Sequence, residues 1–224
     1  MNYNLIVNYY TDKNPVRAHE LNFCILENIS NRNFTTVMII SSQNDYEYLL
    51  SICPDEYKSK LLPLIEDKRP TYNDYFRLTQ RHFSGPHHVN VIANTDIIIP
   101  AETLLYSTYF LSGNSCLALT RWDISNPDSY KESAALYNTP DSQDAWFFIG
   151  AVPLINGADF TLGMAGCDNK IAYLLEASGY EVKNPSKTLK TFHYHISGQR
   201  NYTDIVGHAI ERLPPPYKLI HPTE

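Results

Sequence analysis

The stretch that most constrains the fold is residues 89–99, an apolar β-branched run interrupted by one polar triplet. Asn94, Thr95 and Asp96 separate two segments made almost entirely of Val, Ile and Ala. Because buried strands are bounded by turn residues, the triplet predicts the point at which a strand leaves the core. A carboxylate there needs a cationic or polar partner. The triplet can also be a plain turn, since Asn and Asp are the commonest turn residues.

Length and charge limit the organisation and the partners. At 224 residues the chain can bury one sizeable core and nothing divides it, so we expect a single domain over residues 1–224. The formal net charge of -6 argues against binding to the phosphates of nucleic acids. The sequence opens on no positively charged apolar leader, and its apolar runs fall short of the ~20 residues that span a bilayer. We therefore expect a soluble, unprocessed protein.

The four cysteines, Cys24, Cys53, Cys116 and Cys167, have no paired spacing. Disulfide frameworks and zinc sites usually show such spacing, so we interpret these residues as reduced and mostly buried thiols. Reduced thiols predict a cytoplasmic location.

The first third of the chain predicts a parallel α/β unit. Residues 4–8 and 35–40 have the composition of short buried strands, and between them Asn14 can cap a helix that begins at Pro15. Such a unit pairs its strands in parallel and gathers ligands outside their carboxyl ends. The residues expected at that edge are Tyr9, Tyr10, Thr11, Asp45, Asn94 and Asp96.

Helices are expected between the second strand and the central one. Residues 46–67 look largely helical, and Thr71 with Asp74 predicts a capping box at the start of a further helix. Arg69 lies in the turn before it. A guanidinium there can meet a phosphate, or it can pair with a nearby acid on the surface.

The second half carries strands that end in polar and aromatic residues. We expect strands at residues 116–123 and 142–150, separated by a long loop at 126–141. The aromatic side chains can belong to the core or form a platform on which a sugar stacks, and the sequence leaves both interpretations open. The candidate binding residues are Arg121, Trp122 and Trp146, and Asp144 stands at the entrance of the second of these strands.

A glycine-rich loop at residues 163–166 leads into a helix that ends at Gly179. Asp168 stands at the helix start, as a simple N-cap or as a functional carboxylate. In either role a helix N-terminus should keep it ionised. Gly166 is a candidate substrate contact.

Two late histidines are candidate metal ligands. His193 and His195 lie on one face of an expected strand, because side chains alternate along a strand. Such pairs are also common as ordinary polar surface, and we expect one ligand rather than two. The tail from Leu213 onward is interpreted as an extended strap without chemistry.

In their order along the chain these features resemble GT-A glycosyltransferases of the large inverting family. The triplet is similar to that fold's Asp-x-Asp metal motif in an Asn-x-Asp form, and the acid-initiated helix that ends in Gly179 and Tyr180 is similar to the segment carrying the catalytic base. The resemblance covers residues 4–202. The chain lacks the family's Gln-x-x-Arg-Trp signature and membrane helices, and has Cys167 where a second acid is usual. These departures favour transfer to a soluble acceptor over polysaccharide synthesis.

The resemblance implies an α/β, Rossmann-like GT-A fold with a mixed, mostly parallel central sheet flanked by helices. Residues 1–99 would form the nucleotide-sugar-binding half, residues 100–202 the acceptor half, and residues 203–224 a tail. The donor, most often UDP-linked in this fold, would place its base near Tyr9 and Tyr10.

The same resemblance implies roles for the polar residues. A Mn²⁺ or Mg²⁺ ion would be held by Asp96 and one of His193 and His195. Asp168 would be the base that activates a carbohydrate or other hydroxyl acceptor in an inverting transfer, with Asp144 as runner-up.

Two alternatives stay open. A nucleotidyltransferase would also use a parallel sheet and a metal, but it usually has a glycine-rich loop after the first strand, and residues 9–14 contain no glycine. A non-catalytic nucleotide-sugar or glycan-binding protein on the same scaffold would bind ligand without turnover.

Overall fold

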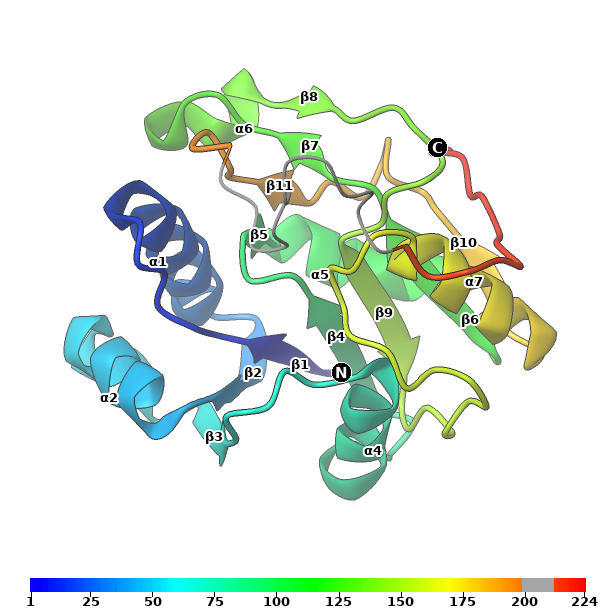
Figure 1. The fold of residues 1–224 in the computed structure, drawn as a ribbon, viewed down its shortest axis with the longest axis horizontal. Helices are drawn as coiled ribbons and strands as arrows, with labels where there is room; N and C mark the ends of the chain where they lie inside the picture. The colour runs from blue at the N-terminus through cyan, green and yellow to red at the C-terminus, as the bar shows by residue number, and fades with distance from the viewer. Residues whose placement is uncertain (199–211) are drawn as a thin grey trace.

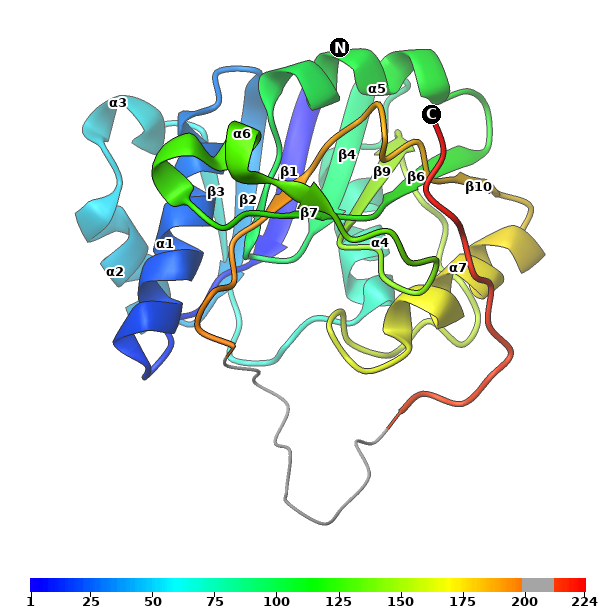
Figure 2. The same cartoon turned by 90° about the horizontal axis from the view of Figure 1, so that it is seen from above.

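The computed structural model describes residues 1–198 and 212–224, so the expected boundary at residue 202 lies outside the described residues. Its centre is a seven-stranded sheet in the order β10-β6-β9-β4-β1-β2-β3, whose strands lie side by side in Figure 2. All strands but β9 point the same way, because β9 is antiparallel to both of its neighbours. The expected mixed, mostly parallel sheet is confirmed. The strands are β1 (Asn2–Asn8), β2 (Phe34–Ser41), β3 (Leu61–Ile65), β4 (His88–Ala93), β6 (Ser115–Leu119), β9 (Ala145–Ile149) and β10 (Glu181–Lys183).

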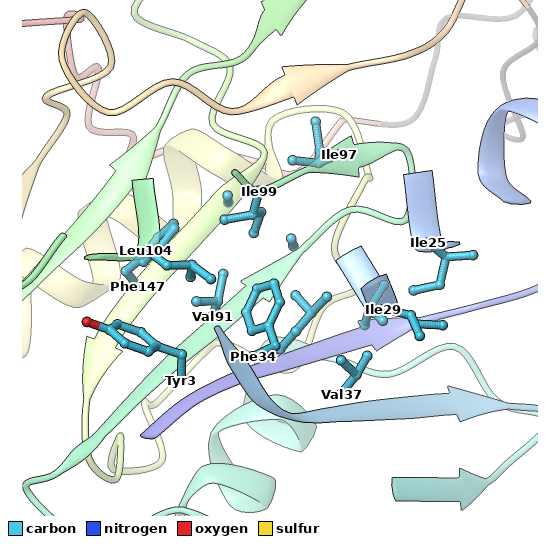
Figure 3. Packing of buried hydrophobic residues seen from close by; sticks show 14 of the residues in the cluster. Tyr3, Ile25, Ile29, Phe34, Val37, Val91, Ile97, Ile99, Leu104 and Phe147 are labelled. Atoms are coloured by element: carbon cyan, nitrogen blue, oxygen red, sulfur yellow. The ribbon is translucent and has the colours of Figure 1, made fainter. Parts of the chain in front are cut away.

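Helices cover both faces of this sheet because its strands are apolar on both sides. On β1, Leu5 and Val7 point into one hydrophobic layer and Ile6 into the other. The first layer is completed by α1 (Pro15–Ser30), α2 (Gln43–Ile52) and α5 (Ala101–Phe110). Figure 3 shows Ile25 and Val91 among its side chains. The second layer is completed by α4 (Tyr72–His82) and α7 (Cys167–Ala177).

A second, smaller sheet packs beside α1. It has the order β5-β11-β7-β8 and is drawn with these labels in Figure 1. Its strands are β5 (Ile97–Ile98), β7 (Trp122–Asp123), β8 (Ala135–Leu136) and β11 (Phe192–His193). His193 of β11 is paired with Ile97 on one side and with Asp123 on the other. This register brings the residue after the polar triplet, an acid and a histidine next to one another.

The first predicted helix forms as expected. Asn14 caps α1 by accepting hydrogen bonds from the backbone N–H groups of Val16 and Arg17 at 2.9 and 3.3 Å, and Pro15 occupies the first turn. All four cysteines are free and buried, as predicted. None of the described helices is long and apolar enough to cross a membrane.

Three sequence-based expectations need correction. The segment 46–67 contains α3 (Asp55–Lys58) and then β3, because pairing with β2 at the sheet edge supplies the hydrogen bonds that a helix would have made. An edge strand also tolerates Pro63. Residues 116–123 form β6 and β7 in different sheets. The chain breaks at Thr120, whose N–H bonds to the side chains of Asn184 and Ser186.

The third correction concerns the loop at 126–141. It includes a 3₁₀ turn, η1 (Pro127–Ser129), a short helix, α6 (Tyr130–Ser133), and strand β8. The C-terminal segment is extended, as expected, and its backbone bonds to α7 through Lys218 N–H and Asn169 C=O at 2.9 Å.

The capping box at the start of α4 should hold that helix against the loop at residues 158–162. Thr71 Oγ1 accepts a hydrogen bond from the Asp74 N–H at 3.2 Å, and the Thr71 N–H donates to Asp74 Oδ2 at 3.0 Å. We expect Thr71→Ala to lower the free energy of unfolding by about 0.5–2 kcal/mol in urea titrations, because the Asp74 N–H loses its acceptor. Thr71→Ser keeps the hydroxyl and should lie close to wild type. Equal losses in both variants would assign the effect to packing of the methyl group.

Candidate functional site

One cleft, with a volume of about 400 Å³, opens where the central sheet meets the small sheet and the loop before α7. The carboxyl ends of β1 and β4 contribute Asn8 and Asn94 to its wall. Ten of the residues singled out from the sequence line it: Tyr10, Arg69, Asn94, Asp96, Arg121, Asp144, Gly166, Asp168, His193 and His195.

Asp96 lies at the inner end of this cleft and is only 8% exposed. Its Oδ2 accepts a hydrogen bond from Arg17 Nη2 at 2.5 Å and lies 3.3 Å from His193 Nε2. Burial alone would raise the pKa of Asp96, but His193 and Arg17 hold it well below the usual range of a carboxyl. The carboxylate is therefore ionised and has the cationic partners that its position requires.

Arg17 was not singled out from the sequence, although it dominates the surroundings of Asp96. Its second nitrogen donates to Glu20 at 2.9 Å, and Glu20 is fully buried. Glu20 in turn accepts from the N–H and hydroxyl of Ser197, at 2.6 and 2.9 Å. One signal was available, because Arg17 lies four residues before Leu21 on the buried face of α1.

His193 lies between two carboxylates. Its Nδ1 is 2.6 Å from Asp123 Oδ1, and its Nε2 faces Asp96. Burial lowers the pKa of His193, but Asp96 and Asp123 outweigh burial and raise it to about 9. Burial and Arg17 lower the pKa of the neighbouring His195. Its Nε2 is buried and has no hydrogen-bond partner within the described part of the chain.

These side chains would fit a divalent metal ion that displaces the proton held by His193 between Asp96 and Asp123. One ligand atom from each of Asp96, His193 and His195 lies within 4.8 Å of the others, the sole such group among the described residues. The unpartnered Nε2 of His195 is a donor that an ion would satisfy. Asp123 contacts Nδ1, the ring nitrogen of His193 that points away from Asp96. Metal-binding histidines commonly have such a carboxylate at their other nitrogen, which orients the ring.

Arg121 extends the polar network to the other wall of the cleft. It donates to Asp123 at 2.9 Å and to Asp144 at 3.0 Å, and the Tyr137 ring lies 4.2 Å below its guanidinium. Asp144 also accepts a hydrogen bond from Asn94 at 2.9 Å. The result is a charge chain of alternating sign, which runs in the order Glu20, Arg17, Asp96, His193, Asp123, Arg121 and Asp144.

Asp168 lies in the first turn of α7, but the residue in the N-cap position is Gly166. Burial and the neighbouring Asp144 raise the pKa of Asp168 to about 8. The expectation that the helix start keeps this carboxyl ionised at neutral pH is therefore wrong, because burial and a like charge outweigh the helix dipole. The Cys167 thiol donates to its Oδ1 at 3.2 Å.

The remaining sequence candidates lie away from the cleft. Tyr9 is fully buried and donates its hydroxyl to Asn22 at 2.7 Å, so its ring belongs to the core and is not free to stack on a base. Thr11 and Asp45 bond to each other, through the Thr11 N–H at 3.0 Å.

Neither tryptophan forms an open platform. Trp146 is fully buried and meets Tyr72 edge-on, with ring centroids 6.2 Å apart. Trp122 is half-buried in the small sheet, where it donates to Ser186 C=O at 2.8 Å and stacks under Lys190 at 4.0 Å. The core interpretation therefore holds for Trp146, and Trp122 serves the packing of the small sheet.

Sequence reasoning gave no role to several residues of the site. Besides Arg17, these are Asp123, Tyr137 and Arg212. Arg212 directly precedes the tail, and an isolated arginine before a proline-rich segment gives no local signal of function.

No protein-family model matches this sequence, and no curated protein matches it. Solved structures do. A mannosyltransferase, PcManGT from Pyrobaculum calidifontis in complex with GDP-Man and Mn²⁺, has a TM-score of 0.52 and 17% identity over 90% of this chain. The match spans 58% of that protein's own length.

A second similar structure is 4-diphosphocytidyl-2C-methyl-D-erythritol synthase from Anaerococcus prevotii DSM 20548. Its TM-score is 0.50 at 12% identity, and the match covers 91% of both chains. At such identities the likeness concerns the fold. The chain has an α/β fold of the GT-A, Rossmann-like kind, with a mostly parallel central sheet flanked by helices.

Proposed function

We propose that this protein is a metal-dependent glycosyltransferase that moves a sugar from a nucleotide-sugar donor to an acceptor hydroxyl. The observation that carries the proposal is the group formed by Asp96, His193 and His195 at the carboxyl edge of a GT-A sheet. The similar fold of a mannosyltransferase bound to GDP-Man and Mn²⁺ supports it. Ligands in open α/β sheets gather at this edge.

The donor set favours Mn²⁺ over Mg²⁺. Mg²⁺ prefers oxygen ligands, whereas two imidazoles and one carboxylate suit a transition metal. Bound there, the ion would neutralise the charge that develops on the departing nucleoside diphosphate. Asp123 fixes the orientation of His193, and Arg17 keeps Asp96 ionised in the absence of ligand. Tyr10 and Arg69 line the adjoining wall, which we assign to the donor.

Asp168 is the better candidate for the base. Asp144 is held by Arg121 and Asn94, so both of its oxygens already accept hydrogen bonds. Asp168 has a pKa near that of an effective general base working close to neutral pH, and it lines the same cleft. It would take the proton of the acceptor hydroxyl, and attack from the face opposite the leaving group would invert the anomeric carbon.

A nucleotidyltransferase is the second candidate. It is favoured by one observation, the match to the diphosphocytidyl-methylerythritol synthase over 91% of both chains. The product separates the two functions. A glycosyltransferase releases a nucleoside diphosphate from a nucleotide sugar, whereas a nucleotidyltransferase releases pyrophosphate from a nucleoside triphosphate. Assays with UDP- and GDP-linked sugars and with all four triphosphates, each with and without Mn²⁺, decide between them. A non-catalytic binding protein would give neither product.

His195 gives the sharpest test of the metal site. We expect His195→Gln to weaken Mn²⁺ binding by about 10- to 100-fold or more in calorimetric titrations with UDP or GDP present. Its melting temperature should stay close to wild type, because the Nε2 that is lost has no hydrogen-bond partner among the described residues. His221→Gln, at an exposed histidine outside the cleft, is the matched control. Equal Mn²⁺ affinities in the two variants would remove His195 from the site.

The pH dependence of transfer tests the base. A base must be ionised to act, so kcat/KM should rise with pH and level off above about 8, the pKa of Asp168. Asp168→Asn should lower the rate by about 10²–10⁴ while nucleotide binding persists. Asp144→Asn removes the like charge that raises the pKa of Asp168, so it should move the acid limb to lower pH. If Asp144→Asn instead abolishes transfer at every pH, Asp144 is the base.

A further inference from the structure

Two arginines lie directly on the glycine loop of the cleft. A Cβ on Gly163, whose φ is +82°, would stand 2.6 Å from Arg69 Nη2. A Cβ on Gly166, whose φ is +80°, would stand 3.1 Å from Nε and Cγ of Arg212. Both positions favour glycine for their positive φ, and the missing Cβ lets a guanidinium approach the loop closely.

The position of Arg212 is fixed by its neighbours. Its backbone pairs with Ala165, and the next residue, Leu213, donates its N–H to the Ala165 carbonyl at 3.0 Å. The guanidinium lies over the Tyr217 ring at 5.7 Å, and the Tyr217 hydroxyl donates back to the Leu213 carbonyl. The backbone of Arg212 is thus held against the glycine loop, while its side chain is exposed at the cleft.

Arg212 also differs from most cations of the cleft in whether a carboxylate forms an ion pair with it. Arg17, Arg121 and His193 are each paired with carboxylates. Within residues 1–198 and 212–224, neither Arg69 nor Arg212 forms an ion pair, and the exposed Asp141 that also lines the cleft is paired with neither. The planar donors of a guanidinium match the oxygens of a phosphate, and here they face an open cleft.

The two arginines contact opposite ends of the same glycine loop. The positive charge of Arg69 interacts with the Tyr10 hydroxyl. Gly163 lies between Arg69 and the amide oxygen of Asn94, two residues before the candidate metal ligand Asp96. Arg212 packs against Gly166, which is the N-cap of α7. Asp168 lies in the first turn of the same helix. An acceptor whose hydroxyl reaches Asp168 would thus have its other end beside Arg212.

We propose that Arg212 binds a phosphate group on the acceptor, so that the substrate is a phosphorylated alcohol and not a neutral sugar. This inference rests on the proposed function, because it uses Asp168 to locate the acceptor. The phosphate can come from a soluble sugar phosphate or from a lipid phosphate headgroup, and both present the same oxygens to the guanidinium.

Calorimetric titration of the full chain tests the proposal, with glucose 6-phosphate, glucose, and vesicles of phosphatidylcholine with and without phosphatidic acid as probes. Each titration is run alone and with UDP and Mn²⁺ present. Arg212→Gln should weaken binding of the phosphate probe about tenfold or more, the loss of one charge-assisted hydrogen bond. Arg212→Lys should lose less. Lys218→Gln removes one charge from the same segment outside the cleft, where Lys218 pairs with Glu176 at 3.0 Å, and should bind like wild type.

The outcomes separate this proposal from the proposed function. Preference for glucose 6-phosphate over glucose supports a soluble acceptor, and binding only to vesicles with phosphatidic acid supports a lipid-linked one. Loss of phosphate binding in Arg212→Gln with UDP affinity unchanged supports the assignment. An equal loss of UDP affinity would place Arg212 in the donor site and overturn it, as would failure of every phosphate probe to bind wild type. Failure of UDP and Mn²⁺ to bind wild type would instead count against the proposed function.

Discussion

The buried contact between Asp96 and Arg17 is the interaction on which the rest of the site depends. A carboxylate that is 8% exposed is tolerated only because a guanidinium and an imidazole meet the same oxygen. Removal of one partner from a buried pair typically costs about 3–5 kcal/mol, because the other charge is left without compensation. Asp96 is therefore structural as well as a candidate ligand. Its substitution would leave Arg17 of α1 without this partner and would destabilise both α1 and the cleft.

The charge chain also explains why the small sheet is needed. The residues of the charge chain come from α1, the turn after β4, β11, β7 and the start of β9, which are far apart in the sequence. The pairing of β11 with both β5 and β7 sets the register that puts His193 between Asp96 and Asp123. Alternating charges largely offset each other: four acids and three cations, with His193 protonated, leave a net charge of -1, so the chain can be rigid without strong repulsion of an anionic donor. The guanidinium of Arg69 is left to attract that donor, and the guanidinium of Arg212 to attract the acceptor phosphate.

Environment, and not residue type, separates the two acids considered as bases. Asp144 is ion-paired with Arg121, whereas burial and the charge of Asp144 raise the pKa of the half-buried Asp168 to about 8. Two carboxyls that share one region and are driven apart in this way are a common arrangement in active sites. The position of Asp168 in the first turn of α7 lowers the proton affinity less than burial and the like charge raise it.

The α/β class, the capped helices α1 and α4, and the polar break after β4 could be predicted from the sequence, because capping residues and apolar periodicity act over a few neighbouring residues. The sequence also identified ten of the 25 residues that line the cleft. Tertiary contacts were needed to show that β3 is a strand and that Trp146 is in the core. They were also needed to show that Arg17 contacts Asp96 and that Asp123 contacts His193. Those outcomes depend on pairing between distant segments and on burial, which sets both the accessibility of a ring and the pKa of a carboxyl. Neither the pairing of distant segments nor the burial of a side chain can be predicted from a local pattern of residues.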